Sequence, residues 1–312
     1  MAEEKFVFAP ARREEIRAKV CLTGSSGSGK TLSALLLAHG LAPLGDWRRI
    51  AVVDTENDSA KQYCGQQIGD TIIPQDEGSF FHCSLSPPYS CERIVSLIRQ
   101  VEESGNFDVL IFDTFSHAWT GSGGVLERVD AIGKLEGWKQ MTPRFRRMID
   151  AMRMSSLHVI ATLRTKTEFE IESTVNEQGK SKILGVKKIG TKPEMRDGVD
   201  YEFTCVFGLD ADHLGKVDKD RTNLFRDRPP SLLNVATGKM LREWCGGAVC
   251  QIGSADWVAL RIAELNAYNG DLPGLATMWS GVSGHRSRCS KAAWEALTAA
   301  KDAGKARLTA AK

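Results

Sequence analysis

Short apolar runs, several of them rich in β-branched residues, alternate along this chain with longer segments in which apolar residues recur at helical spacing. The apolar runs predict strands at 19–23, 50–53, 79–83, 109–112, 158–162 and 201–207. The helical spacing predicts helices at 31–38, 92–103 and 145–154. Strands that are apolar throughout are buried on both faces, which is typical of a parallel sheet covered by helices. We therefore expect an α/β fold with a mainly parallel sheet flanked by helices.

Two parts of the chain depart from this alternation. Residues 168–190 alternate polar and apolar positions on both sides of the turn Asn176-Glu177-Gln178-Gly179, which predicts a hairpin that projects from the sheet. From residue 256 onward the spacing predicts a small C-terminal helical region, with helices at 256–266, 271–280 and 290–303. The expected parts are an N-terminal arm at 1–16, a core at 17–245 and a helical region with a basic tail at 246–312.

A glycine-rich sequence follows the first predicted strand and opens the first helix. It reads Gly24-Ser25-Ser26-Gly27-Ser28-Gly29-Lys30-Thr31 and fits the phosphate-binding pattern G-x-x-x-x-G-K-[ST] at every specified position. Backbone N–H groups of such a loop point at phosphate oxygens, and the start of the helix adds the positive end of its dipole. Lys30 is expected to reach the β- and γ-phosphates, and the Thr31 hydroxyl is expected to bind Mg²⁺.

Charged residues follow three of the predicted strands. Asp113 comes directly after an apolar strand, which is the Walker B pattern, and we expect it to hold the Mg²⁺ shell. Glu56 follows the second strand and could orient or deprotonate an attacking water. Arg164 follows the strand at 158–162 and could sense the γ-phosphate or contact DNA. The expected catalytic residues are Glu56, Lys30 and Arg164, although each of the three strand-end residues could instead be a solvated turn residue.

Composition and charge narrow the class of protein. The chain has 312 residues, of which 42% are hydrophobic and 26% charged, with a net charge of +2. No stretch approaches the roughly 20 apolar residues of a membrane span, and the charged N-terminus is not a secretory signal. With eight scattered cysteines, these features favour a cytoplasmic protein with reduced thiols and no membrane partner. The basic segments 139–153 and 285–312 could follow nucleic-acid phosphates or could be solvated helix faces.

Together these motifs resemble the RecA-like recombinase core. More closely, they resemble phage-encoded AAA-type ATPases with a short RecA-like core, the group that contains single-strand annealing recombinases. The most specific part is the run Asp113-Thr114-Phe115-Ser116-His117-Ala118-Trp119. The resemblance covers roughly residues 5–245. It also rests on Phe6–Ala11, the phosphate-binding loop with Ser33–Leu35, Asp54-Thr55-Glu56, Ser86–Tyr89, Trp138, Leu163–Lys166 and Tyr201-Glu202.

The resemblance implies a RecA-like P-loop NTPase core that uses ATP and Mg²⁺ and has DNA-linked ATPase activity. Glu56 matches the catalytic glutamate of RecA-like proteins, and Asp113 matches their Walker B aspartate. In RecA a glutamine senses the γ-phosphate where this chain has Leu163-Arg164, so we assign that role to Arg164. In these proteins the two loops that follow the Walker B strand and the next strand face single-stranded DNA. Here those loops would be residues 115–137 and 164–198.

The N-terminal arm carries a second resemblance. Phe6-x-x-Ala9 and Phe8-x-x-Ala11 are similar to the Phe-x-x-Ala element by which RecA-like recombinases hook a neighbouring subunit. An aromatic anchor of this kind enters a pocket while the arm extends the edge of a sheet. We therefore expect self-assembly into a ring or a filament, with an edge strand packed on its own domain as the alternative.

The leading functional hypothesis is an ATP-hydrolysing protein that acts on single-stranded DNA in phage recombination, replication or repair. The same core could also serve a ring-forming DNA helicase or a helicase loader. A third alternative is a DNA-binding scaffold that uses ATP with little turnover. A GTPase is disfavoured because the chain lacks an Asn-Lys-x-Asp sequence. The helical tail could contact DNA, a single-strand-binding protein, or neither.

Overall fold

The computed structural model describes residues 16–175, 181–246, 255–268, 272–284, 286 and 289–310. These residues form two compact units, one spanning Arg17–Arg242 and the other containing Ile16 and the chain from Glu243 onward. None of the helices in the described ranges has both the length and the apolar character needed to cross a membrane.

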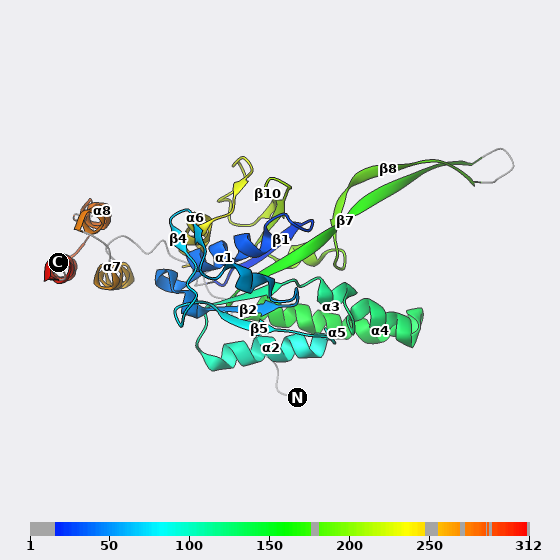
Figure 1. The fold of residues 1–312 in the computed structure, drawn as a ribbon, viewed down its shortest axis with the longest axis horizontal. Coiled ribbons are helices and arrows are strands. Elements are labelled where there is room, and N and C mark those ends of the chain that lie inside the picture. Colours follow the sequence, from blue (N-terminus) through cyan, green and yellow to red (C-terminus); the bar gives the residue numbers. More distant parts are fainter. Residues whose placement is uncertain are drawn as a thin grey trace, which may run out of the picture. The chain divides into compact units, whose positions relative to one another are not determined.

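A single large sheet forms the centre of the first unit (Figure 1). Its strands run in the order β11-β10-β9-β1-β7-β6-β2-β5. Their bounds are β1 Lys19–Gly24, β2 Ile50–Asp54, β5 Phe81–Ser84, β6 Val109–Asp113, β7 His158–Val175, β9 Cys205–Leu209, β10 Leu214–Asp220 and β11 Ser231–Leu232. The pairs from β9 to β5 are parallel, and only β10 and β11 add antiparallel edge pairing among the described strands of this path. The predicted α/β class with a mainly parallel sheet is confirmed.

Helices cover both faces of this sheet. On one face, α1 (Lys30–Leu41) packs against β6 and β7. On the other, α2 (Cys91–Ser104) and α5 (Lys134–Met154) pack together over alternate residues of the strands, among them Val53, Leu110 and Phe112. Successive residues of a strand point to opposite faces. Strands β1, β2 and β6 are therefore buried along their whole length, which explains why they read as continuous apolar runs.

The segment after β6 differs from the prediction. Residues 115–137 were expected to be a DNA-facing loop, but they form α3 (His117–Thr120), α4 (Val125–Ile132) and the start of α5. The predicted helix at 145–154 is therefore only the last part of a longer helix that contains Pro143. Gly137 lies where α4 and α5 touch, since a Cβ there would come 2.5 Å from the Val129 carbonyl oxygen. Gly137 is thus a close-packing residue inside α5.

The predicted hairpin at 168–190 is confirmed by the strand pairing. Strand β7 leaves the sheet and pairs antiparallel with β8 (Ser181–Pro193), from Thr165 opposite Pro193 to Val175 opposite Ser181. Figure 1 shows this hairpin extending well beyond the sheet. The turn predicted at 176–179 lies outside the described residues. The last predicted strand, 201–207, begins later than expected, because residues Val199–Glu202 form a 3₁₀ turn before β9.

The remaining elements are short or lie near the chain's C-terminal end. Small elements after β2 are a 3₁₀ helix at Ser59–Tyr63 and a hairpin of β3 (Gln67–Ile68) and β4 (Thr71–Ile72). Helix α6 (Val235–Cys245) follows β11. The predicted C-terminal helices correspond to α7 (Ala255–Ala267), α8 (Leu272–Ser283) and α9 (Lys291–Ala310). These three helices share a small core of their own around Val258, Val282 and Leu297.

Helices α1 and α6 cross at two glycines, and this crossing generates a stability prediction. A Cβ on Gly40 would come 2.2 Å from the Val235 carbonyl oxygen, and one on Gly238 would come 2.2 Å from the Leu37 carbonyl oxygen. Gly40→Ala should therefore destabilise the protein by about 1–3 kcal/mol through overpacking, although alanine is the better helix former by about 1 kcal/mol.

Urea unfolding of the full chain measures this effect. Gly190→Ala is the matched control, because a Cβ at Gly190 has nothing within 4 Å. A Gly40→Ala variant as stable as the control would show that the two helices do not need their glycines.

Candidate nucleotide-binding site

The glycine-rich loop connects β1 to α1 and forms an open cradle. Gly27 and Gly29 have φ angles of 79° and 81°, a left-handed conformation that favours glycine. A Cβ on Gly27 would meet nothing within 4 Å, so the turn needs glycine for its backbone and leaves room for a ligand. Lys30 lies at the first position of α1, and its Nζ donates to the Ser25 carbonyl oxygen at 2.7 Å. The residues of the loop thus fit a bound phosphate chain.

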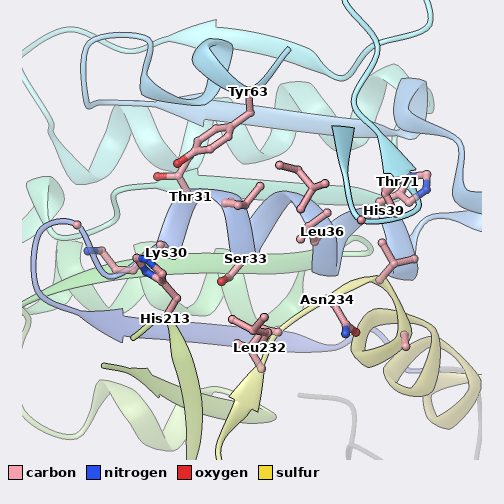
Figure 2. Close-up of a pocket in the computed structure, with 18 of the residues that line it drawn as sticks. Lys30, Thr31, Ser33, Leu36, His39, Tyr63, Thr71, His213, Leu232 and Asn234 are labelled. Carbon is pink, nitrogen blue, oxygen red and sulfur yellow. The ribbon is translucent and has the colours of Figure 1, made fainter. Parts of the chain in front are cut away.

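A cavity of about 1250 Å³ opens beside this loop. Its wall includes Lys30, Thr31, Glu56, Tyr63 and Arg164. Figure 2 shows Lys30, Thr31 and Tyr63 at one end of the cavity and His39 with Thr71 at the other. The volume is above the roughly 300–1,000 Å³ that is usual for a small-molecule site, so a nucleoside triphosphate fits. The cavity lies at the carboxyl ends of the parallel strands, where ligands of open α/β sheets bind.

Thr31 and Asp113, the two residues expected to bind a metal, are hydrogen-bonded to each other. The Thr31 Oγ1 donates to Asp113 Oδ2 at 2.6 Å, and the Thr162 Oγ1 donates to Asp113 Oδ1 at 2.6 Å. Burial raises the pKa of the Asp113 carboxyl, and the hydrogen bonds from Thr162 and Thr31 act in the opposite direction. A hydroxyl beside a carboxylate suits Mg²⁺, which takes few protein ligands and completes its shell with water and phosphate oxygens. The residues present therefore fit this metal.

Glu56 and Arg164, predicted from separate strands, form an ion pair at the rim of the cavity. Both Nε and Nη2 of Arg164 lie 2.7 Å from Glu56 Oε1. The Arg164 side chain is 43% exposed and that of Glu56 is 24% exposed. The guanidinium was expected to sense the γ-phosphate or to contact DNA. Instead, the structure places it on the carboxylate that was expected to act on water.

Asp54 is a residue of this site that the sequence reasoning missed. It is 1% exposed, and its carboxylate accepts the backbone N–H groups of Glu56 at 2.7 Å and Ala60 at 3.0 Å. His82 Nε2 lies 3.3 Å from the same carboxylate. These contacts fix the backbone on which Glu56 stands. The only sequence signal was the position of Asp54 at the end of an apolar strand, two residues before Glu56.

Tyr63, His213 and Thr162 were missed as well. Figure 2 shows Tyr63 directed toward Thr31 and His213 lying beside Lys30. His213 comes from the β9–β10 turn, has a φ of 65°, and would lie 3.1 Å from a Cβ on Gly29. A tyrosine that follows a strand-end glutamate is too common a pattern to be recognised without the geometry.

The two hydroxyls on Asp113 generate a prediction about the metal. Thr162→Val removes one hydrogen bond to the buried Asp113 carboxylate. The pKa of Asp113 should therefore rise further, and the affinity of the site for Mg²⁺ should fall by about tenfold. Thr162→Ser keeps the hydroxyl and is the matched control. A Mg²⁺ titration of the binding of a fluorescent, non-hydrolysable ATP analogue measures the effect. Equal Mg²⁺ dependence in the two variants would contradict the role of Thr162.

Three comparisons relate the chain to known proteins. Residues 16–227 match the AAA domain family AAA_24. A stretch of 140 residues is 31% identical to a tRNA dimethylallyltransferase of Paracidovorax citrulli (strain AAC00-1), covering 38% of this chain and 38% of that protein. A crystal structure of the RadB recombinase matches 69% of this chain and 84% of its own, with a TM-score of 0.38 and 15% identity. At that score the likeness to RadB carries no information about function.

The family match is the informative comparison. It covers more than half of the chain and includes the phosphate-binding loop, Glu56, Asp113 and Arg164. The chain spans well under half the length of the transferase. This chain belongs to the AAA domain family AAA_24 and carries the nucleotide-binding core of a P-loop ATPase.

Proposed function

We propose that this protein hydrolyses ATP with Mg²⁺ and acts on single-stranded DNA. The observation that carries the first part is the convergence of five side chains: Lys30, Thr31, Glu56 and Arg164 line one cavity, and Asp113 is hydrogen-bonded to Thr31. They come from three neighbouring strands and the start of one helix. Nucleotide hydrolysis requires a phosphate-binding loop, side chains that hold a metal ion, a carboxylate and a cation.

Each side chain has a role in this proposal. The loop N–H groups and Lys30 hold the phosphates, and burial lowers the pKa of Lys30 while Glu56 and Asp113 raise it. Thr31 and Asp113 hold the metal. A Mg²⁺ ion held there would supply positive charge to stabilise the negative charge that develops on the phosphate oxygens. Glu56 orients the attacking water and takes its proton.

Arg164 has two anionic partners in this scheme. Without nucleotide it neutralises the Glu56 carboxylate, with both donors within 2.7 Å of one oxygen. A γ-phosphate in the cavity offers the same guanidinium a second anion, and charge-assisted bonds to phosphate are strong. Sharing Arg164 with the phosphate frees Glu56 to bond water. The ion pair therefore occupies the Glu56 carboxylate until another anion competes for Arg164.

The DNA part of the proposal is supported by an exposed surface at the start of α5. Lys134 and Leu135 lie four and three residues before Trp138, so each of them is a neighbour of Trp138 on the helix surface. Leu135 is 90% exposed and Trp138 is 37% exposed. A cation beside an exposed indole matches single-stranded DNA, whose phosphates attract lysine and whose bases stack on aromatic rings. The proposed contact thus lies on α5, at the end of the segment 115–137 that was expected to be a loop and at Trp138 directly after it.

The finer biological setting rests on the family resemblance. The resemblance to phage-encoded short RecA-core ATPases supports a role in recombination, replication or repair. The two Phe-x-x-Ala sequences support assembly into a ring or filament, and they lie outside the described residues. The basic C-terminal tail is proposed to contact DNA or a single-strand-binding protein.

Glu56→Gln tests the hydrolytic role. The amide cannot take a proton from water, so turnover should fall by roughly 10²–10⁴-fold, while binding of an ATP analogue persists. Steady-state ATP hydrolysis with and without a single-stranded oligonucleotide measures this. Asp70→Asn, at the far part of the same cavity, is the matched control and should retain turnover. Normal hydrolysis by the Glu56→Gln variant would remove Glu56 from the mechanism.

Trp138→Ala tests the DNA surface. Loss of one stacking ring should weaken binding of a single-stranded oligonucleotide by about 1–3 kcal/mol, and Trp138→Phe should retain most of the affinity. Fluorescence anisotropy at fixed salt measures both variants, because affinity for nucleic acid depends on ionic strength. Equal affinity of the alanine variant and the unmodified protein would place DNA elsewhere on the molecule.

A further inference from the structure

The first turn of α3 contacts the backbones that carry both members of the Glu56–Arg164 pair. The Ser116 side chain is fully buried, and its Oγ accepts the Arg164 backbone N–H at 3.0 Å. His117 Nδ1 lies 2.7 Å from the Oγ1 of Thr55, the residue next to Glu56. The N-cap residue and the first residue of one short helix therefore contact two strand ends that are separate in the sequence.

The Thr55 hydroxyl determines which nitrogen of His117 carries a proton. Its Oγ1 accepts the Thr114 N–H at 2.9 Å and donates to the Thr114 carbonyl oxygen at 3.1 Å. A hydroxyl has one proton and two lone pairs, so the remaining lone pair accepts from His117 Nδ1–H. Burial and the nearby Arg164 lower the pKa of His117, which keeps the ring neutral. The ring also stacks on Tyr89, with 5.0 Å between ring centroids.

The other side of α3 meets the exposed surface at the start of α5. The centroid of the Trp119 ring lies 5.8 Å from the ring centroid of Trp138 and 5.3 Å from that of Phe145. Within α3, the backbone N–H of Trp119 donates to the Ser116 carbonyl oxygen at 2.9 Å. Trp119 and Ser116 thus belong to one hydrogen-bonded turn. A shift of the Trp119 backbone would therefore also shift the backbone of Ser116.

The turn is also tightly enclosed. A Cβ on Gly121 would come 2.6 Å from the His117 carbonyl oxygen and 2.7 Å from Tyr89 Cδ2. Close packing of this kind transmits small shifts because the neighbouring atoms have no free space to absorb them. The contacts from Trp138 through Trp119 to Ser116 and His117 are therefore continuous.

We propose that α3 is a positioning element that links single-stranded DNA on the Trp138 surface to the geometry of the Glu56–Arg164 pair. A base stacked on Trp138 shifts Trp119, and α3 carries that shift to Thr55 and to the Arg164 backbone. The ion pair then opens more readily, so ATP turnover rises. This inference rests on the proposed function, because it requires both hydrolysis at Glu56 and DNA on α5.

His117→Ala removes the hydrogen bond to Thr55 and leaves the phosphate-binding loop, Thr31, Asp113 and Trp138 unchanged. The DNA-stimulated kcat should fall by about tenfold, which is within the usual range for coupling between two sites. KM for ATP and Kd for the oligonucleotide should stay within about twofold, since neither ligand loses a contact. His117→Asn should restore the stimulation, because its side-chain amide can donate to Thr55 from the place of Nδ1.

Trp119→Leu tests the same link from the other end and remains informative if His117→Ala does not fold. It should also lose stimulation while an ATP analogue and the oligonucleotide still bind. Stimulation of both variants equal to that of the unmodified protein, or no rescue by asparagine, would overturn the inference alone. An unmodified protein that hydrolyses no ATP, or whose hydrolysis ignores DNA, would overturn the proposed function together with it.

Discussion

A buried carboxylate at the end of β6 holds this site together. Asp113 is 1% exposed, yet hydroxyls from α1 and β7 both donate to it, so it joins the phosphate-binding helix to two strands. It lies opposite Asp54 in the parallel register of β6 and β2. Two buried acidic groups side by side repel each other and lose hydration, and burial indeed raises the pKa of Asp113. A cation at Thr31 would relieve this repulsion, so the fold itself favours metal binding at that point.

The sequence predicted those parts of the fold that depend on local patterns. Buried strands such as Val109–Asp113 read as apolar runs, and the glycine-rich loop is recognisable from its own eight residues. The sequence could not predict which residues of neighbouring strands lie opposite one another, because periodicity does not encode register. Thr162 reaches Asp113 across 49 residues of chain, and Arg164 reaches Glu56 across 108. These two contacts, on which the chemistry of the site depends, became visible only in three dimensions.

The largest error, the loop expected at 115–137, has a physical explanation. Gly133, Gly137 and Pro143 look like helix breakers in a sequence. Gly137 instead allows the backbones of α4 and α5 to touch, and the left-handed Gly133, with a φ of 101°, joins the two helices. Pro143 is accommodated inside α5. The expectation of a loop came from the family resemblance, whereas packing between α4 and α5 makes this segment helical.

The helical structure of this segment changes how a ligand on the surface can act. A loose loop would absorb the binding of DNA by rearranging itself, whereas α3 is closed by its own hydrogen bonds and held between two aromatic contacts. In the proposed mechanism, nucleotide and DNA therefore act on one ion pair from two directions. The phosphate would compete for the Arg164 guanidinium from inside the cavity, and α3, which contacts the Arg164 backbone and Thr55, would act from the opposite side. An ion pair suits this use, because a small change in its geometry or in its competing anions changes which partner Glu56 faces.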